Sequence, residues 1–383
     1  RSVQIAFALS SLAENFVVEK RLLISLVKDN FAALNLAKYG LEINVDDLSK
    51  EEIINYIENE NFNSLNYMKQ DYFNFKKYIN SEFAPRHMDY LNNDCAPDLI
   101  RFMNIKIGGR KNKSYYNFLK GIYEADLPVF SEQQVNFLNY LSDMLPLVRQ
   151  NEYLIVKNIL DENNSINAIK NALANTIIKY TDAQFNHAIK FMLASKLITL
   201  HNEIVSIQVP IDDQYREWIK DLINYGLTRY IIDFGDTEDF KLWSSYRMDQ
   251  VQLKLCKNPK HNQLGTYVYD GIVYIFASIK KDASIQEHLN YKDKFLQPDM
   301  FQWECQAGLN EGKQRELIQS KKAYLFIRKV ESENGLVLPF TFVGTGKLEN
   351  PRKTENVKGS LLFDIHLETE LSDYLQYDFG LEK

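Results

Sequence analysis

The sequence has few of the residues that build disulfide scaffolds or metal centres. Its 383 residues include three isolated cysteines, at positions 95, 256 and 305, and six scattered histidines. An odd cysteine count without a C-x-x-C pair argues against a disulfide framework or a zinc site and favours a reducing cytoplasm. The histidines show no H-E-x-x-H or other ligand spacing. We therefore expect no metal site in this chain and a cytoplasmic location.

Long apolar runs and an excess of basic residues are also missing. No stretch is long and apolar enough to cross a bilayer, and no signal peptide is present, so we expect no membrane partner. The formal net charge of −6 counts only weakly against nucleic-acid binding, because local patches decide phosphate contact. The chain opens at Arg1 in an amphipathic segment, and we expect it to be a fragment of a longer protein.

Catalytic motifs with a recognised spacing are likewise missing. Gly344-Thr-Gly-Lys347 looks like the end of a phosphate-binding loop. That loop needs a glycine where Thr341 stands and Ser or Thr where Leu348 stands, and here it opens no helix. There is also no G-x-S-x-G motif and no H-x-K spacing of the phospholipase-type nucleases. We therefore expect no catalytic residue in this chain.

One loose nuclease pattern is kept as an alternative. Pro298-Asp299 followed by Glu311 and Lys313 has the order in which metal-dependent nucleases place the carboxylates that hold Mg²⁺ and the lysine that steadies the attacking water. The second half of such a site lies on a strand, whereas the sequence from 310 to 314 predicts a turn. A protein-interaction module is the other alternative function.

The residues that are present predict an α+β protein in several domains. Residues 1–150 carry apolar residues at helical spacing, with a capping box at Ser131 and Gln134, and are expected to form a helical coupling region. Residues 226–383 contain strand patterns separated by Gly, Asn and Pro, as a mixed or barrel-like sheet needs. Within them, 228–234 is expected to be a leading strand and 240–255 a helix. The clearest boundary is expected near 212–226.

Residues 151–225 have the element order of a winged helix. They predict a helix, then a second helix opened by a capping box at Thr181 and Gln184. A hairpin follows, with its turn at His201-Asn202. Winged helices bind DNA or serve as spacers between proteins, and the sequence leaves both roles open.

The stretch from Tyr291 to Gln306 combines aromatic and polar residues in alternation. Pro298 excludes one continuous helix, and the alternation is typical of strands with rings on one face. Aromatic rings beside a carboxylate and an amide could hold a planar polar ligand. The alternative is a pair of core strands with Asp299 in the turn between them.

Several short motifs occur in a fixed order in the C-terminal part of the chain. They are Arg247 within S-S-Y-R-M-D-Q-V, Asn262-Gln-Leu-Gly265, a strand ending Ser278-Ile-Lys280, Tyr291-x-Asp293-x-Phe295, Phe301-x-Trp303-x-Cys305-Gln306, Leu325-Phe-Ile-Arg328 and Phe340-x-Phe-Val-Gly344. In this pattern the chain resembles a domain that closes a group of bacterial DNA helicase-nucleases, the ATP-dependent Type IV restriction enzymes that cut DNA containing modified cytosine. Many members carry Ser where this chain has Cys305.

The resemblance implies a non-catalytic C-terminal portion of such an enzyme, with an SRA-like target-recognition domain at 226–383. Its partners would be double-stranded DNA containing 5-methylcytosine or 5-hydroxymethylcytosine and the helicase and nuclease domains upstream in the same chain. A homodimer is compatible with the sequence. ATP and Mg²⁺ would belong to those upstream domains, and no cofactor is expected in this chain.

The same resemblance assigns expected roles to individual residues. Tyr291, Phe295 and Trp303 would stack on a base that has left the helix. Asp293 would accept from the exocyclic amine of cytosine, and Gln306 would complete the contacts to the base edge. The alternatives are that the rings are core residues and that Asp293 holds its own loop. The expected contacts to the DNA backbone are Arg247, Lys280, Lys292, Lys294, Asn262 and Gly265.

Overall fold

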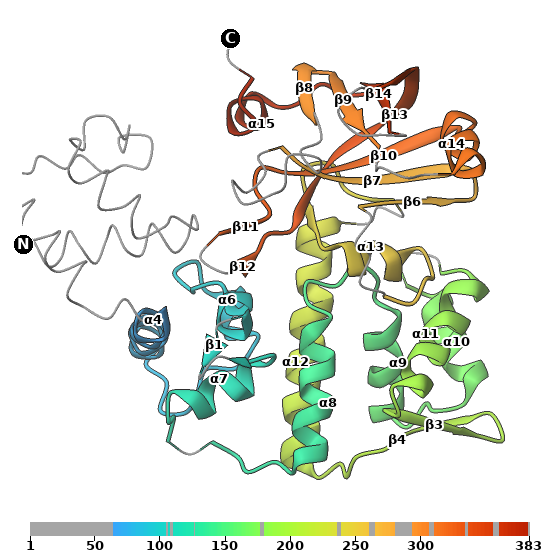
Figure 1. Ribbon diagram of the computed structural model, residues 1–383. Helices are drawn as coiled ribbons and strands as arrows, with labels where there is room; N and C mark the ends of the chain where they lie inside the picture. The colour runs from blue at the N-terminus through green and yellow to red at the C-terminus, as the bar shows by residue number, and fades with distance from the viewer. Residues whose placement is uncertain are drawn as a thin grey trace, which may run out of the picture. The chain divides into compact units, whose positions relative to one another are not determined.

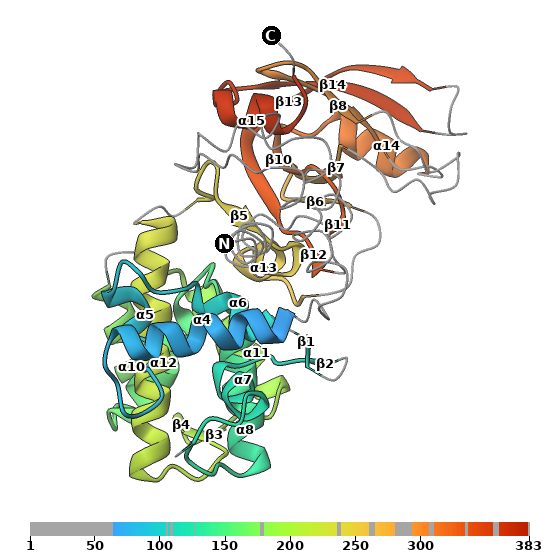
Figure 2. The ribbon, with the colours of Figure 1, turned by 90° about the vertical axis from the view of Figure 1, so that its left-hand side faces the viewer.

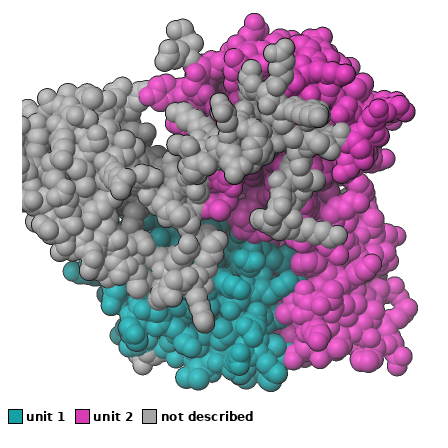
Figure 3. Space-filling view, in the orientation of Figure 1, with its two compact units in different colours: residues 1–145, 209–225, 333–336 teal, residues 146–208, 226–332, 337–383 magenta. Residues whose placement is uncertain are grey.

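The computed structural model describes residues 64–381, with gaps at 105, 108–109, 126, 177–179, 236–238, 260–264, 280–292, 306–309, 334–335 and 355–359. The chain forms two compact units, shown in Figure 3: unit 1 comprises 1–145, 209–225 and 333–336, and unit 2 comprises 146–208, 226–332 and 337–383. Each unit is assembled from segments that are not consecutive. The observed units therefore differ from the three consecutive domains expected from the sequence, although one segment border falls at 225–226 in both.

Unit 1 is mainly helical. Its described elements are α4 (Ser64–Tyr78), α5 (Asp89–Asn92), α6 (Leu99–Asn104), β1 (Lys106–Ile107), β2 (Arg110–Lys111), α7 (Tyr115–Gly121), α8 (Glu132–Asp143) and the first part of α12 (Asp213–Phe234) (Figure 1). The predicted capping box opens α8, where Ser131 Oγ accepts from the Gln134 amide and Gln134 Oε1 accepts from the Ser131 amide. This local prediction is confirmed.

The core of unit 1 is aromatic. Phe102 and Phe118 stack with their ring centroids 4.4 Å apart, and Tyr72 meets Phe118 edge-on. His87 is buried, and its Nδ1 lies 2.8 Å from Asp221 Oδ2, which also accepts from the His87 backbone amide. Burial favours a higher pKa for Asp221, but the hydrogen bonds from His87 outweigh it and lower the pKa below its ordinary value.

Helix α12 corrects the expectation of a leading strand at 228–234 and of a change to strands near 212–226. The helix runs without interruption from Asp213 to Phe234. The segment is rich in β-branched and aromatic residues, which favours a strand by composition. Its buried rings nevertheless recur four residues apart: Tyr230 and Phe234 are both buried, with centroids separated by 5.6 Å. Helical spacing of the buried side chains prevails over local propensity here.

The first part of unit 2 has the predicted order of helix, helix and hairpin. It contains α9 (Asn151–Leu160), α10 (Ile166–Ala174), α11 (Asp182–Ala194), β3 (Ile198–His201) and β4 (Ile204–Ile207). The capping box of Thr181 and Gln184 is present. The hairpin turn lies one residue later than expected, because His201 pairs with Ile204 and the turn is formed by the two residues between them. Asn202 and its successor both have positive φ, 49° and 65°, as a tight hairpin turn requires.

The second part of unit 2 is a mixed sheet. Its strands are β5 (Ser245–Tyr246), β6 (Thr266–Tyr269), β7 (Ile272–Ser278), β8 (Lys294–Gln297), β9 (Met300–Glu304), β10 (Lys322–Arg328), β13 (Phe340–Lys353) and β14 (Leu361–Leu367). The strand order is β6-β7-β10-β13-β14-β9-β8, with β5 paired to β13; β7 and β10 are parallel and the other pairs antiparallel. Strands β11 (Ser332–Glu333) and β12 (Leu336–Val337) form a separate small pair. The α+β class is confirmed.

The sheet buries different side chains on its two faces. One face packs with α14 (Glu311–Ile318) and α15 (Asp373–Asp378) around a core that includes Val273, Leu325 and Ile365. The other face is aromatic: Tyr274 stacks on Tyr324, and their neighbours Phe276 and Phe326 also stack. The sheet is thus covered on one side by short helices and on the other by rings from the segment that precedes it.

That preceding segment corrects the helix expected at 240–255. Only α13 (Met248–Lys254) is helical, and Arg247 is its N-cap. The earlier residues serve the aromatic face instead, since the Phe240 ring meets Phe326 edge-on with centroids 5.1 Å apart and Tyr246 pairs with Phe340 as part of β5. Figure 1 shows α13 between the sheet and the helices α9 to α11 of the same unit.

Two further sequence features are explained by the sheet. Gly344 to Lys347 lie inside strand β13, so they form no phosphate-binding loop. A Cβ on Gly346 would lie 2.2 Å from the His366 backbone oxygen, so the close approach of β14 requires glycine there. No helix among the described residues is both long and apolar enough to cross a membrane.

Candidate functional site

Strands β8 and β9 form the hairpin that the aromatic stretch predicted. Phe295 pairs with Phe301, and Lys294 pairs with Gln302. Neighbouring residues along a strand point to opposite faces, so the phenylalanines face the core while Lys294 and Gln302 face outward. Of the other expected site residues, Tyr291, Gln306, Lys280, Lys292 and Asn262 lie outside the described residues.

The Phe295 and Trp303 rings are core residues, which corrects the expectation that they stack on a base. Phe295 stacks on Phe379 of α15 at 5.5 Å between centroids, and Trp303 stacks on Phe363 of β14 at 5.7 Å. Only 8% of Phe295 and 3% of Trp303 is exposed. The physical reason is the strand period, which sends these positions to the face covered by α15.

Asp293 is a buried carboxylate at the start of this hairpin. Only 8% of the residue is exposed, and its Oδ1 accepts a 3.0 Å hydrogen bond from the backbone amide of Glu304. A carboxylate that accepts a hydrogen bond from a backbone amide is held in one orientation. Asp293 therefore ties the start of β8 to the end of β9 through the Glu304 amide, and this hydrogen bond fixes the orientation of its carboxylate.

Glu304 is a second buried carboxylate that the sequence did not single out. Its Oε1 accepts a 2.6 Å hydrogen bond from Thr354 Oγ1 and a longer one, 3.4 Å, from Ser360 Oγ. Ser360 Oγ also donates to the Cys305 carbonyl. Burial raises the pKa of the Cys305 thiol, and its Sγ accepts from the Leu361 amide at 3.1 Å. We name Asp293, Glu304, Cys305, Thr354 and Ser360 the carboxylate cluster.

The carboxylate cluster joins strand ends that are distant in sequence. Glu304 ends β9, Thr354 follows the last residue of β13, and Ser360 precedes β14. The only sequence sign of Glu304 was its place between Trp303 and Cys305 in an alternating strand. Its hydroxyl partners lie 50 and 56 residues further along the chain, so the cluster depends on the pairing of β9 with β14 and of β14 with β13.

The described residues expected to contact the DNA backbone are spread over the sheet. Lys294 is exposed on β8, which is one edge of the strand order. Gly265 precedes β6 at the other edge; its φ is 61° and its carbonyl accepts from the Phe276 amide at 2.8 Å. Arg247 Nε pairs with Asp249 at 3.1 Å beside the start of α13. The strand order thus places Lys294 and Gly265 at opposite edges.

The nuclease alternative gains no support from the geometry. Asp299 lies in the β8–β9 turn, with its Oδ2 3.4 Å from His366 Nδ1. Glu311 and Lys313 lie in α14, a helix capped by Asn310, rather than in the expected turn or on a strand. Among the described residues, no group of three or more His, Cys, Asp or Glu side chains could hold a metal ion.

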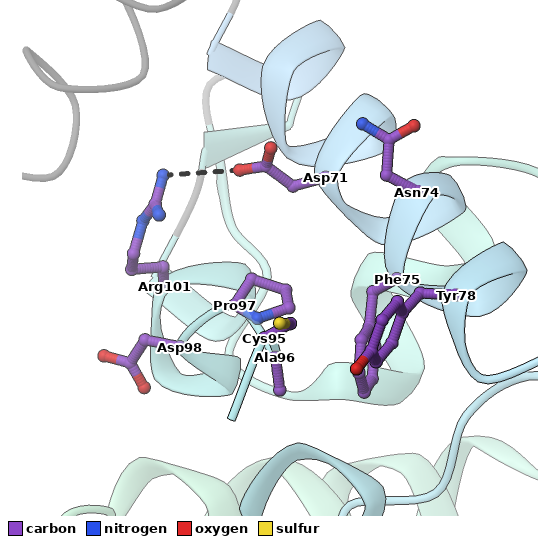
Figure 4. A pocket seen from close by; sticks show the side chains of 9 residues that line it. All are labelled: Asp71, Asn74, Phe75, Tyr78, Cys95, Ala96, Pro97, Asp98 and Arg101. Atoms are coloured by element: carbon purple, nitrogen blue, oxygen red, sulfur yellow. Dashed lines mark ion pairs between the residues drawn. The ribbon is translucent and has the colours of Figure 1, made fainter. Parts of the chain in front are cut away.

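Unit 1 contains a separate open groove of about 500 Å³. It lies between α4 and the segment from 95 to 101, as Figure 4 shows. Arg101 Nη2 is 3.9 Å from Asp71 Oδ2 at one end, and the exposed Tyr78 ring lies at the other. Burial raises the pKa of Asp71, and Arg101 acts against this rise. No residue expected from the sequence to bind a ligand lines this groove.

Comparison with known proteins gives two family matches. Residues 240–379 match a family described as a domain of unknown function, DUF3427. Residues 68–199 match a second domain of unknown function, DUF8090. A search of the curated proteins gave no significant match. The first match covers the sheet and the carboxylate cluster, and the second ends within the β3–β4 hairpin.

Proposed function

We propose that the sheet of unit 2 recognises double-stranded DNA that carries 5-methylcytosine or 5-hydroxymethylcytosine, and that this part of the chain is not itself an enzyme. The observation that carries the proposal is the pair of buried carboxylates, Asp293 and Glu304, linked by the hydrogen bond from the Glu304 amide to Asp293. Burying a carboxylate costs free energy unless polar groups form hydrogen bonds with it. Those hydrogen bonds also fix the orientation of the carboxylate before a ligand binds.

Cytosine suits such an acceptor because its exocyclic amine is a hydrogen-bond donor. A base modified at carbon 5 becomes accessible at every edge once it leaves the stack. In this proposal Asp293 accepts from the amine. Phe295 and Trp303 support the strands from the core and do not touch the base. Residues other than these two would stack on the base. That Tyr291 is one of them stays a prediction.

The proposal extends to the rest of the chain through its family matches. Domains of the DUF3427 type are often found in helicase-associated proteins. The helical segments would then couple target recognition to a helicase and nuclease in the same protein. The helix–helix–hairpin order of α10, α11, β3 and β4 is compatible with a winged helix that contacts either DNA or protein.

The direct test is a mobility-shift titration at fixed salt with duplexes that differ only in one cytosine. The base would be cytosine, 5-methylcytosine or 5-hydroxymethylcytosine. Tighter binding of a modified duplex is expected, and equal affinity for all three would rule the proposal out. Absence of any DNA binding would favour a protein-interaction module. Mg²⁺-dependent cleavage that disappears in Asp299→Ala would favour the nuclease alternative.

A further inference from the structure

The β13–β14 ribbon carries an arginine held in one orientation by a carboxylate. Arg352 Nη1 and Nη2 donate to the two oxygens of Asp364, at 2.7 and 2.6 Å. Asn350 Nδ2 adds a 3.0 Å bond to the same carboxylate. These bonds raise the pKa of Arg352 and lower that of Asp364, so both groups are charged. The Arg352 side chain is nonetheless 45% exposed.

The arginine has donors left for a ligand. A guanidinium offers five N–H groups in a planar fork, and Asp364 takes two of them. No other partner of Arg352 occurs among the described residues. Arginine held in this way is well suited to phosphate, because its fork matches the geometry of phosphate oxygens.

The position of Arg352 places it beside the carboxylate cluster. Arg352 pairs with Leu362, and Leu362 pairs with Glu304, so the three residues form one row across β13, β14 and β9. Strands lie about 4.8 Å apart, which puts the backbones of Arg352 and Glu304 roughly 10 Å apart. Nucleotides of one strand rise about 3.4 Å each along the axis of duplex DNA, so this distance corresponds to about three nucleotides along one strand.

The surrounding ribbon has further exposed cations. Strand β13 runs for 14 residues with a bulge between Glu349 and Arg352. Figure 2 shows the β13–β14 ribbon running out beyond the shorter strands around it. Lys347 and Lys353 are exposed on β13, and Lys294 is exposed on β8, which is separated from β13 by β14 and β9. Negatively charged phosphates complement these side chains.

We propose that Arg352, oriented by Asp364, binds a DNA backbone phosphate within about three nucleotides of the base recognised at the carboxylate cluster. This inference deepens the proposed function and rests on its assignment of DNA as the ligand. Asp364 acts as a positioning residue, since it contacts Arg352 and not the phosphate. Asn350 keeps Asp364 in place.

The test measures the salt dependence of binding for four variants of the full 383-residue chain, on a methylated and an unmodified duplex. Arg352→Ala should lower affinity equally for both duplexes and reduce the slope of log affinity against log salt by about 0.9, the loss of one phosphate contact. Arg315→Ala is the matched control, because the one ion pair of this exposed arginine among the described residues is with Glu311 of the same helix, α14. It should leave affinity and slope unchanged.

Asp364→Asn tests whether Asp364 affects DNA binding by orienting Arg352 or only through its own negative charge. The substitution makes the ribbon more positive, so charge alone would strengthen DNA binding, whereas loss of the positioning contact should weaken it. Glu349→Gln adds the same charge without touching Arg352 and should strengthen binding slightly. Tighter binding by both variants would overturn the positioning role of Asp364. Circular dichroism and thermal midpoints confirm that each variant is folded.

The outcomes separate this inference from the proposed function. An unchanged slope in Arg352→Ala, with modified DNA still preferred, would overturn the phosphate contact alone. An affinity loss confined to duplexes with one particular base at a fixed position would also overturn it, because it would indicate base reading. A slope reduced by Arg352→Ala without any preference for modified cytosine would support the phosphate contact while ruling out modified-base recognition. No DNA binding by the unsubstituted chain would overturn both.

Discussion

Arg149 donates a 2.8 Å hydrogen bond from its guanidinium to the backbone carbonyl of Leu253, which lies near the end of α13. The same guanidinium pairs with both oxygens of Glu152 on α9 and bonds Nδ1 of His187 on α11. Burial, together with the nearby Arg149 charge, lowers the pKa of His187, so its neutral ring can accept that bond. One side chain therefore connects the helices of unit 2 to the helix that precedes the sheet.

Replacing Arg149 by Met should strongly destabilise unit 2. Arg149 and Glu152 are 3% and 0% exposed, and removal of one partner leaves a buried charge uncompensated at a cost of about 3–5 kcal/mol. Urea denaturation should show this loss. The double replacement of Arg149 and Glu152 by Met should cost less than the sum of the single changes. Additive effects would show that the two charges are not coupled.

Trp303→Ala should lower the free energy of unfolding by about 3–5 kcal/mol, because it deletes a buried ring that stacks on Phe363. The matched control is Leu296→Ala on β8, where the side chain is exposed; this change should have little effect. Both are measured by denaturation. A normally stable Trp303→Ala variant that no longer distinguishes modified cytosine would restore the direct base contact expected from the sequence.

Asp293→Asn should reduce the preference for modified cytosine in a variant that circular dichroism shows to be folded. Asparagine keeps the Oδ1 acceptor for the Glu304 amide but replaces one carboxylate oxygen by a donor that repels the cytosine amine. A well-placed base contact contributes about 1–3 kcal/mol of discrimination, and this is the expected change in the ratio of dissociation constants. Asp299→Asn in the β8–β9 turn is the control and should leave the ratio unchanged. Equal effects of the two substitutions would argue against a special role of Asp293.

Because of Lys254, the free energy of unfolding should rise as the pH is raised from about 7.5 to 9.5. Its Nζ donates to the Asp239 carbonyl at 2.8 Å, and burial lowers its pKa from 10.5 to about 8. Between these two pKa values the unfolded chain binds a proton that the folded chain does not, so the free energy of unfolding rises with pH. The expected gain over this range is on the order of 1–2 kcal/mol.

The Lys254→Met variant should lack this rise in chemical-denaturation experiments at a series of pH values. The measurements stop near pH 9.5 because buried tyrosines such as Tyr246 have pKa values raised by burial. Above about pH 10 such tyrosines ionise in the unfolded chain first, which destabilises the fold. An identical pH profile for both proteins would show that Lys254 titrates as it does in the unfolded chain.

The sequence predicted features that depend on neighbouring residues. Ser131 and Thr181 open helices because a capping box needs only four consecutive residues. The alternation around Trp303 predicted the β8–β9 hairpin because strand period is local. The composition around Tyr230 predicted a strand, and this prediction was wrong. The segment continues a helix, because its buried rings pack at helical spacing.

The candidate site was harder to predict because it depends on strand register. Thr354 reaches Glu304, and Arg352 reaches Asp364, only once β13, β14 and β9 are aligned. Asp293 was identified from the family resemblance, but its partner, the Glu304 amide, has no signature in sequence. Register between distant strands is set by the whole sheet and its bulges, so residue spacing alone could not supply it.

The interleaved segments of the two units affect how the protein can be divided for experiments. A piece cut at 240–379 would keep the Leu253 carbonyl but lose Arg149, which binds it in the intact chain. A piece that ends before 209 would deprive unit 1 of 209–225, including Asp221, the partner of buried His87. Cuts at the borders of the family matches therefore remove contacts of the intact chain. Pieces for expression are better chosen to retain both Arg149 and the whole of α12.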